Sequence, residues 1–107
     1  MILKINVVQT DILRGVKSNC HLCPVARAVK RAAINAELDT NNDRVAVSPG
    51  HIIIHTNEKR YVAQTPDKMR EFIQDFDTTG EVKKIRCELE FKIYNKRINR
   101  EIITEVD

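Results

Sequence analysis

The clearest pattern in the chain is that of 82–93, where apolar and polar residues alternate strictly from Lys84 to Ile93. Alternate side chains of a β-strand point to opposite faces of a sheet, so this pattern predicts a strand with one buried and one solvent-exposed face. The apolar set consists of Ile85, Cys87, Leu89, Phe91 and Ile93. Shorter patterns of the same kind predict four further strands, at 2–8, 44–48, 51–56 and 60–64.

Apolar residues recur at intervals of three and four in two other segments, which predicts two amphipathic helices. The first begins near Cys23, has Pro24 at its first position and runs to about Glu37. The second is expected to have Thr65 as its N-cap and to end before Gly80. Its expected core stripe consists of Met69, Phe72, Ile73 and Phe76. A single helical turn, over 11–14 with Thr10 as its cap, is expected before the first helix.

These elements follow one another in the order β-α-β-β-β-α-β. The order predicts an α+β fold with a single domain, in which two helices cover one face of a mostly antiparallel sheet of five or six strands. The domain is expected to span 1–93, and 94–107 to form a C-terminal strand or arm. The β-branched run in that segment fits a sixth strand that pairs back on 85–93. It also fits an arm that pairs with another chain, for example in a homodimer.

Composition narrows the class of protein. The chain has 107 residues, of which 42% are hydrophobic, and this length corresponds to one domain. No apolar run approaches the roughly 20 residues that cross a bilayer, so no membrane partner is expected. The first eight residues are typical of a strand and not of a signal peptide. Together with an odd number of cysteines, three, this predicts a cytoplasmic location.

Charge is distributed unevenly along the chain. The net charge is only +3, yet the stretch 12–36 contains five basic residues and no acidic one. An acid-free basic helix face is either a solvated surface or a docking surface for an anionic partner, such as a host protein or complex, a nucleic acid or a small anionic ligand. The candidate binding residues are Arg14, Lys17, His21, Arg27, Lys30, Arg31 and Ile34.

Two cysteines, Cys20 and Cys23, stand at the expected start of the first helix. Such a pair can hold zinc, form a redox disulfide or pack as small apolar side chains. Zinc would need two further ligands, and His51 and His55 are expected to point away from the helix start because they share a strand face opposite Ile52 and Ile54. No cofactor is therefore predicted, with zinc on the two cysteines as the alternative.

The chain also resembles a family of small proteins without an assigned activity, found in bacteriophages, prophages and actinobacteria. The motifs that carry the resemblance lie between residues 3 and 92: Asp11-Ile12, Gly15, Cys20, Cys23-Pro24-Val25-Ala26, Ala28, Pro66, Phe72-Ile73, Phe76-Asp77, Gly80, Val82 and Glu88-Leu89. The segment after residue 93 looks like an addition, and Cys87 stands where an apolar residue is usual. The resemblance implies a setting, that of an accessory phage protein in an infected cell, and no functional residues.

The sequence contains no glycine-rich phosphate loop, no nucleophile-elbow motif and no carboxylate-rich metal motif. The expected function is therefore that of a non-enzymatic binding protein, a phage accessory factor that binds or inhibits a host macromolecule through the basic helix face. One alternative is a nucleic-acid or nucleotide binder that uses the same basic stretch. Another is a zinc- or thiol-dependent protein that uses Cys20 and Cys23.

Overall fold

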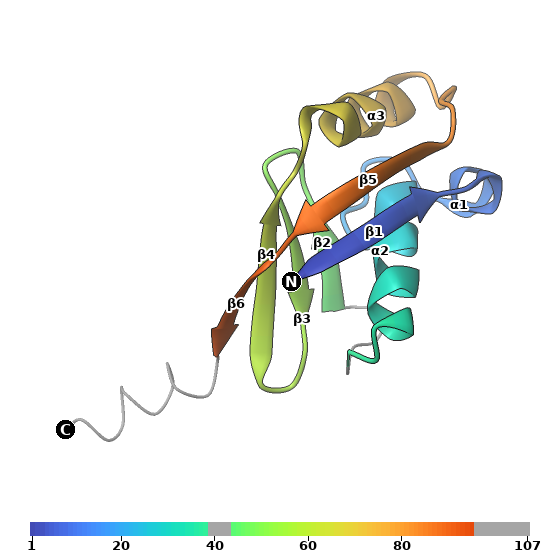
Figure 1. Ribbon diagram of the computed structural model, residues 1–107. Coiled ribbons are helices and arrows are strands. Elements are labelled where there is room, and N and C mark those ends of the chain that lie inside the picture. The colour runs from blue at the N-terminus through green and yellow to red at the C-terminus, as the bar shows by residue number, and fades with distance from the viewer. Residues whose placement is uncertain (39–43, 96–107) are drawn as a thin grey trace.

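A computed structural model describes residues 1–38 and 44–95 of the chain. The described part forms an α+β domain in which strands and helices share one hydrophobic core (Figure 1). In chain order, its elements are β1 (Ile2–Val7), α1 (Gln9–Arg14), α2 (Pro24–Asn35), β2 (Val45–Val47), β3 (His51–His55), β4 (Lys59–Gln64), α3 (Asp67–Thr78), β5 (Ile85–Glu90) and β6 (Lys92–Asn95).

The strands form two antiparallel sheets instead of the one sheet that was expected. The first pairs β1 with β5, and the second has the order β2-β3-β4-β6. The two sheets are connected by the segment 85–95, because the predicted long strand is divided at Phe91 into β5 and β6. The start of that strand was also wrong, since β5 begins at Ile85 and 82–84 lie outside it.

The division at Phe91 changes the strand's partner. Before it, β5 pairs with β1, and the amide of Phe91 still donates a 2.7 Å hydrogen bond to the carbonyl of Met1. After it, β6 pairs with β4. The final described strand therefore does not pair back on 85–93. The expected domain boundary at residue 93 falls inside β6, and the remainder of the predicted strand or arm, 96–107, lies outside the described residues.

One face of the sheets is buried against the helices, as predicted. Along β1 every second side chain is buried. Of the five apolar residues predicted on the buried face of the long strand, Leu89 and Phe91 are buried, Ile85 and Cys87 are partly buried, and Ile93 is half exposed because it lies on β6 beyond the core. From α2 the cluster receives Val25, Val29 and Ala33, and from α3 it receives Met69, Phe72, Ile73 and Phe76. The stripe predicted on α3 is thus confirmed, and the stripe predicted on α2 is confirmed except at Ala36, which is exposed after the end of the helix. No helix in the described part of the chain is long and apolar enough to span a membrane.

The ends of the helices differ from the prediction at two threonines. α1 has Val8 at its N-cap position and not Thr10, and the helix is six residues long instead of one turn. Thr65 does not cap α3, because Pro66 occupies that position and the buried Thr65 hydroxyl donates to the carbonyl of Ser48 at 2.8 Å. Cys23 caps α2 as expected, although this helix ends at Asn35, slightly before the predicted end.

Candidate functional site

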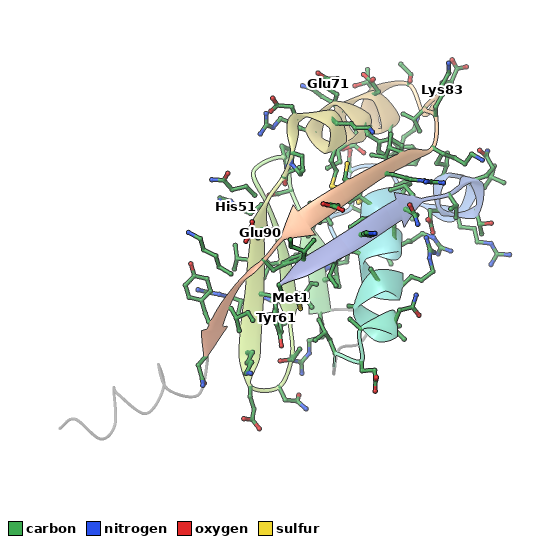
Figure 2. All side chains as sticks on the ribbon, viewed as in Figure 1. Met1, His51, Tyr61, Glu71, Lys83 and Glu90 are labelled. Atoms are coloured by element: carbon green, nitrogen blue, oxygen red, sulfur yellow. The ribbon has the colours of Figure 1, made fainter. Side chains whose placement is uncertain are left out.

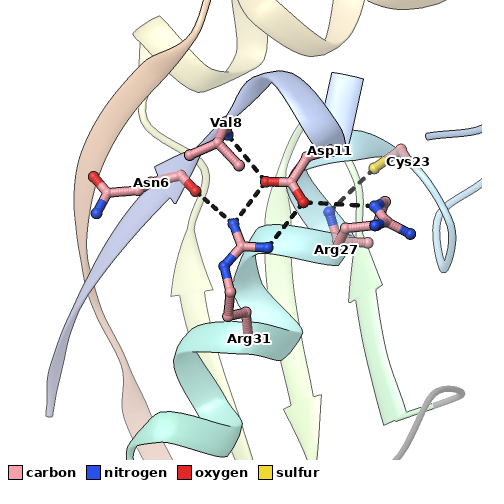
Figure 3. Close-up of polar contacts among 7 residues, drawn as sticks. Asn6, Val8, Asp11, Cys23, Arg27 and Arg31 are labelled. Atoms are coloured by element: carbon pink, nitrogen blue, oxygen red, sulfur yellow. Dashed lines mark hydrogen bonds and ion pairs between the residues drawn. The ribbon is translucent and has the colours of Figure 1, made fainter. Parts of the chain in front are cut away.

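The most distinctive polar feature of the structure is a completely buried carboxylate, that of Asp11 in the first turn of α1 (Figure 3). A carboxylate at the third position of a helix can accept a hydrogen bond from the amide that precedes the helix. Asp11 does so, because its Oδ2 accepts from the amide of Val8 at 3.0 Å. The local sequence therefore turns this side chain inward, where α1 meets α2.

Two arginines of α2 face Asp11. Arg31 donates from Nη1 to Oδ1 at 2.9 Å and from Nη2 to Oδ2 at 2.6 Å, so the pair is bidentate (Figure 3). Its Nη2 also donates to the main-chain carbonyl of Asn6, which ties β1 to the same group. The Nε of Arg27 lies 3.5 Å from Oδ1 of Asp11, a distance that permits ionic attraction without a hydrogen bond. This cluster connects β1, α1 and α2.

The charges around Asp11 decide its ionisation. Burial alone would raise the pKa of this carboxyl, since it disfavours the charged form. The hydrogen bonds from Arg31 and Val8, together with the positive charges of Arg31 and Arg27, outweigh burial and hold the pKa of Asp11 below its ordinary value. Asp11 is therefore the internal counter-ion of two residues from the predicted binding set.

The other predicted binding residues fall into two groups. Arg14 and Lys17 are exposed, at the end of α1 and in the loop that follows, and Ile34 is 61% exposed on α2. His21 instead has a structural contact, because its Nδ1 lies 2.9 Å from the main-chain carbonyl of Val45. Lys30 is partly buried on α2 and takes part in polar interactions. The structure thus brings the basic residues onto the neighbouring elements α1 and α2 and engages some of them internally.

The two loop cysteines have different environments. Cys23 is buried at the N-cap of α2, where its Sγ accepts a hydrogen bond from the amide of Ala26 at 3.4 Å. Burial raises the pKa of the Cys23 thiol, and the carboxylate of Asp77 adds to this shift. Cys20 is exposed. Among the residues that the structure describes, no three or more His, Cys, Asp or Glu side chains are grouped so that they could hold a metal ion.

The histidines considered as zinc ligands lie on β3, where Ile52 and Ile54 are fully buried on the opposite strand face. His51 is exposed and points away from the domain (Figure 2). The predicted alternation of β3 is therefore confirmed. It places these side chains on the face that the helices do not cover.

The sequence analysis did not identify the exposed apolar residues that lie near the basic residues of α1 and the following loop. Leu13 is 75% exposed on α1, and Val16 and Leu22 in the following loop are both more than two-fifths exposed. No local pattern signalled this exposure, because α1 buries the successive residues Asp11 and Ile12 and leaves Leu13 exposed through the way the helix packs on the domain. Leu13 and Val16 lie next in sequence to Arg14 and Lys17, so this surface combines apolar and basic groups.

Comparison with protein-family models, with curated proteins and with solved structures gave no match. The assignment of a function therefore depends on the geometry of the chain itself.

Proposed function

We propose that the protein is a non-enzymatic binding protein that docks an acidic face of a partner protein onto the surface formed by α1, the loop after it and the outer side of α2. This surface, called here the α1–α2 surface, includes Arg14, Lys17 and Lys30 with the exposed apolar residues Leu13, Val16 and Ile34. The observation that carries the proposal is its imbalance of charge. Residues 9–36 contain five basic residues and one acidic residue, a net charge of +4.

Asp11 cannot neutralise this surface. One carboxylate faces two guanidinium groups, so the Asp11 cluster retains one net positive charge even before Arg14 and Lys17 are added. Long-range attraction to an acidic partner raises the rate of encounter, and apolar contacts such as those available at Leu13 slow dissociation. The resemblance to phage proteins supports a host protein or protein complex as the partner, and a phage accessory factor as the biological role.

A nucleic acid is the second candidate partner, because the same positive charges could contact phosphates. Two observations favour a protein instead. The surface exposes apolar side chains, and the aromatic residues that could stack on bases lie elsewhere: Tyr61 is in the core, and the Tyr94 ring is stacked under the Arg60 guanidinium at 5.1 Å.

The proposal is tested by charge reversal at matched sites. The variant Arg14→Glu/Lys17→Glu/Lys30→Glu is compared with Lys4→Glu/Lys59→Glu/Lys92→Glu, which has the same net charge and changes exposed lysines on β1, β4 and β6. Arg27 and Arg31 are kept because they stabilise Asp11. In pull-downs from bacterial lysate treated with nuclease, we expect the wild type and the control to enrich the same acidic protein. The affinity of the first variant for it should fall more than tenfold, about 1.4 kcal/mol.

Equal enrichment by both variants would remove the α1–α2 surface from the proposal. If enrichment disappears after nuclease treatment, and affinity for DNA or RNA falls steeply with the logarithm of salt concentration, the nucleic-acid alternative is correct. Circular dichroism melting of each variant establishes that a loss of binding does not arise from unfolding.

A further inference from the structure

We propose that Cys20 and Cys23 form a thiol–disulfide exchange site, in which the exposed Cys20 attacks a disulfide of a low-molecular-weight thiol and Cys23 closes an internal disulfide. The site is separate from the proposed docking function, since neither thiol belongs to the charged residues of the α1–α2 surface. It is argued from the turn that connects the two residues, the hollow that both line and the difference in their exposure.

The turn brings the two residues together. The amide of Cys23 donates to the carbonyl of Asn19 at 3.0 Å, so 19–23 form one helix-like turn that leads into α2. Residues three apart on such a turn have Cβ atoms about 5–6 Å apart. A disulfide needs about 3.5–4.5 Å between Cβ atoms, so a small adjustment of the turn is enough.

Several hydrogen bonds hold this turn together. The side-chain Oδ1 of Asn19 accepts from the amides of His21 and Leu22, both at 2.9 Å. The carbonyl of Cys20 accepts from the amide of Val47 at 2.9 Å, which attaches the turn to β2. The turn keeps the Cys23 thiol close to Cys20, so its effective concentration there is high. This favours formation of the internal disulfide over accumulation of a mixed disulfide on Cys20.

Both thiols line one surface hollow of about 240 Å³, together with Ser18, Pro49 and Asp77. Of the two cysteines that line it, Cys20 is exposed and Cys23 is buried. An incoming disulfide therefore reaches Cys20 first. Cys23 is the slower nucleophile because burial raises the pKa of its thiol, and it acts in the second step, when the mixed disulfide is held beside it.

The reaction balances with oxidised glutathione as the oxidant. The Cys20 thiolate forms a bond to one glutathione sulfur, the glutathione disulfide breaks, and one glutathione leaves as a thiolate that takes up a proton. Cys23 then loses its proton to solvent and forms a bond to Cys20 Sγ, and the second glutathione leaves in the same way. The two protein thiols are oxidised to one disulfide, and one glutathione disulfide is reduced to two thiols.

Peptide mapping of the folded wild-type protein tests the site. After exposure to oxidised glutathione and acid quenching, trypsin releases both cysteines on one peptide, 18–27, and Cys87 on another, 87–92. We expect peptide 18–27 to lose two hydrogens without retaining glutathione. The variant Cys23→Ser should retain glutathione on Cys20, and Cys87→Ser, the matched control, should react like the wild type.

Two results would overturn the proposal: a wild-type peptide 18–27 that ends with glutathione attached to Cys20, or one that stays reduced while Cys87 is modified. The wild-type map decides by itself if Cys23→Ser does not fold. Because no partner protein is present in this assay, its outcome is independent of the docking experiment.

Discussion

At the scale of single residues, Asp11 determines the character of the basic stretch. Its carboxylate is fully buried, and its nearest charged groups are the guanidinium groups of Arg31 and Arg27 on another helix. A buried charge is tolerated only when it is paired and hydrogen-bonded, and Asp11 fulfils both conditions. Two of the residues predicted to bind a partner therefore also hold α1 against α2.

The substitution Asp11→Asn should lower the free energy of unfolding by about 2 kcal/mol. It removes the counter-charge of both arginines while it preserves the shape of the side chain. The loss is smaller than the roughly 3–5 kcal/mol of a fully buried pair, because both arginine side chains are partly exposed. Urea unfolding followed by circular dichroism measures the difference.

The matched control is Asp67→Asn, which breaks a 2.7 Å ion pair with Arg70 in which Asp67 is 86% exposed. This change should cost no more than about 0.5 kcal/mol. Equal losses from the two substitutions would mean that the burial of Asp11 contributes nothing to stability.

Asp11 should also make the stability of the protein depend on pH, with a definite sign. Burial opposes ionisation of Asp11, but its hydrogen bonds and the two arginines hold its folded-state pKa below the unfolded value. The stabilisation by the ionised carboxylate is therefore complete above about pH 4 and is lost as the pH falls through the folded-state pKa. The stability difference between the wild type and Asp11→Asn should be constant from about pH 7 to pH 5 and should shrink below about pH 4. A difference that grows on acidification has the opposite sign and contradicts this assignment.

At the scale of elements, the junction between α1 and α2 depends on a close approach at Gly15. A Cβ atom at this position would lie 2.5 Å from Cδ of Pro24, the first residue of α2. The proline ring is rigid, so one of the two helices would have to move. Gly15 is therefore required by packing, since its φ of −69° is accessible to any residue.

We expect Gly15→Ala to cost about 1–3 kcal/mol of stability, the range of an overpacked site. Gly50→Ala is the matched control, because a Cβ atom at Gly50 would meet nothing within 4 Å. Thermal unfolding of the two variants measures the contrast. A Gly15→Ala protein as stable as Gly50→Ala would show that the junction adjusts without cost.

At the scale of the whole molecule, the segment 85–95 joins the two sheets into one domain. It pairs with β1 before Phe91 and with β4 after it, and the ring of Phe91 is 98% buried where the partner changes. The buried faces of both sheets contribute to one core cluster. Disruption at Phe91 should consequently affect both sheets together.

The variant Phe91→Ala should lose about 3–5 kcal/mol, whereas Ile93→Ala, at a half-exposed position of β6, should lose less than about 1 kcal/mol. Urea unfolding should remain a single transition by circular dichroism and by tyrosine fluorescence, which reports on Tyr61 in β4 and Tyr94 in β6. An unchanged midpoint for Phe91→Ala would show that Phe91 does not join the sheets.

The chemistry at the start of α2 was predictable in part. The residues Cys20 and Cys23, and the proline that follows them, are visible as a local pattern, and local hydrogen bonds build the turn between them. The pairing of Arg31 with Asp11 was not predictable, because these residues are 20 positions apart and only the packing of α1 against α2 brings them together. The exposure of Leu13 likewise depends on how α1 packs against the rest of the domain.

The sequence by itself determined the class of fold, the core stripe of α3 and the buried face of β1, β2, β3 and β4, but not the exposure of β6. These features follow from periods of 3.6 and 2 residues, which are local properties of the chain. Only the tertiary structure decided that the strand over 85–95 changes partner at Phe91 and that Asp11 forms ion pairs with Arg27 and Arg31. Strand partners are chosen by hydrogen bonds in the plane of the sheet, perpendicular to the side chains whose alternation the sequence displays, and ion pairs between helices depend on how those helices pack.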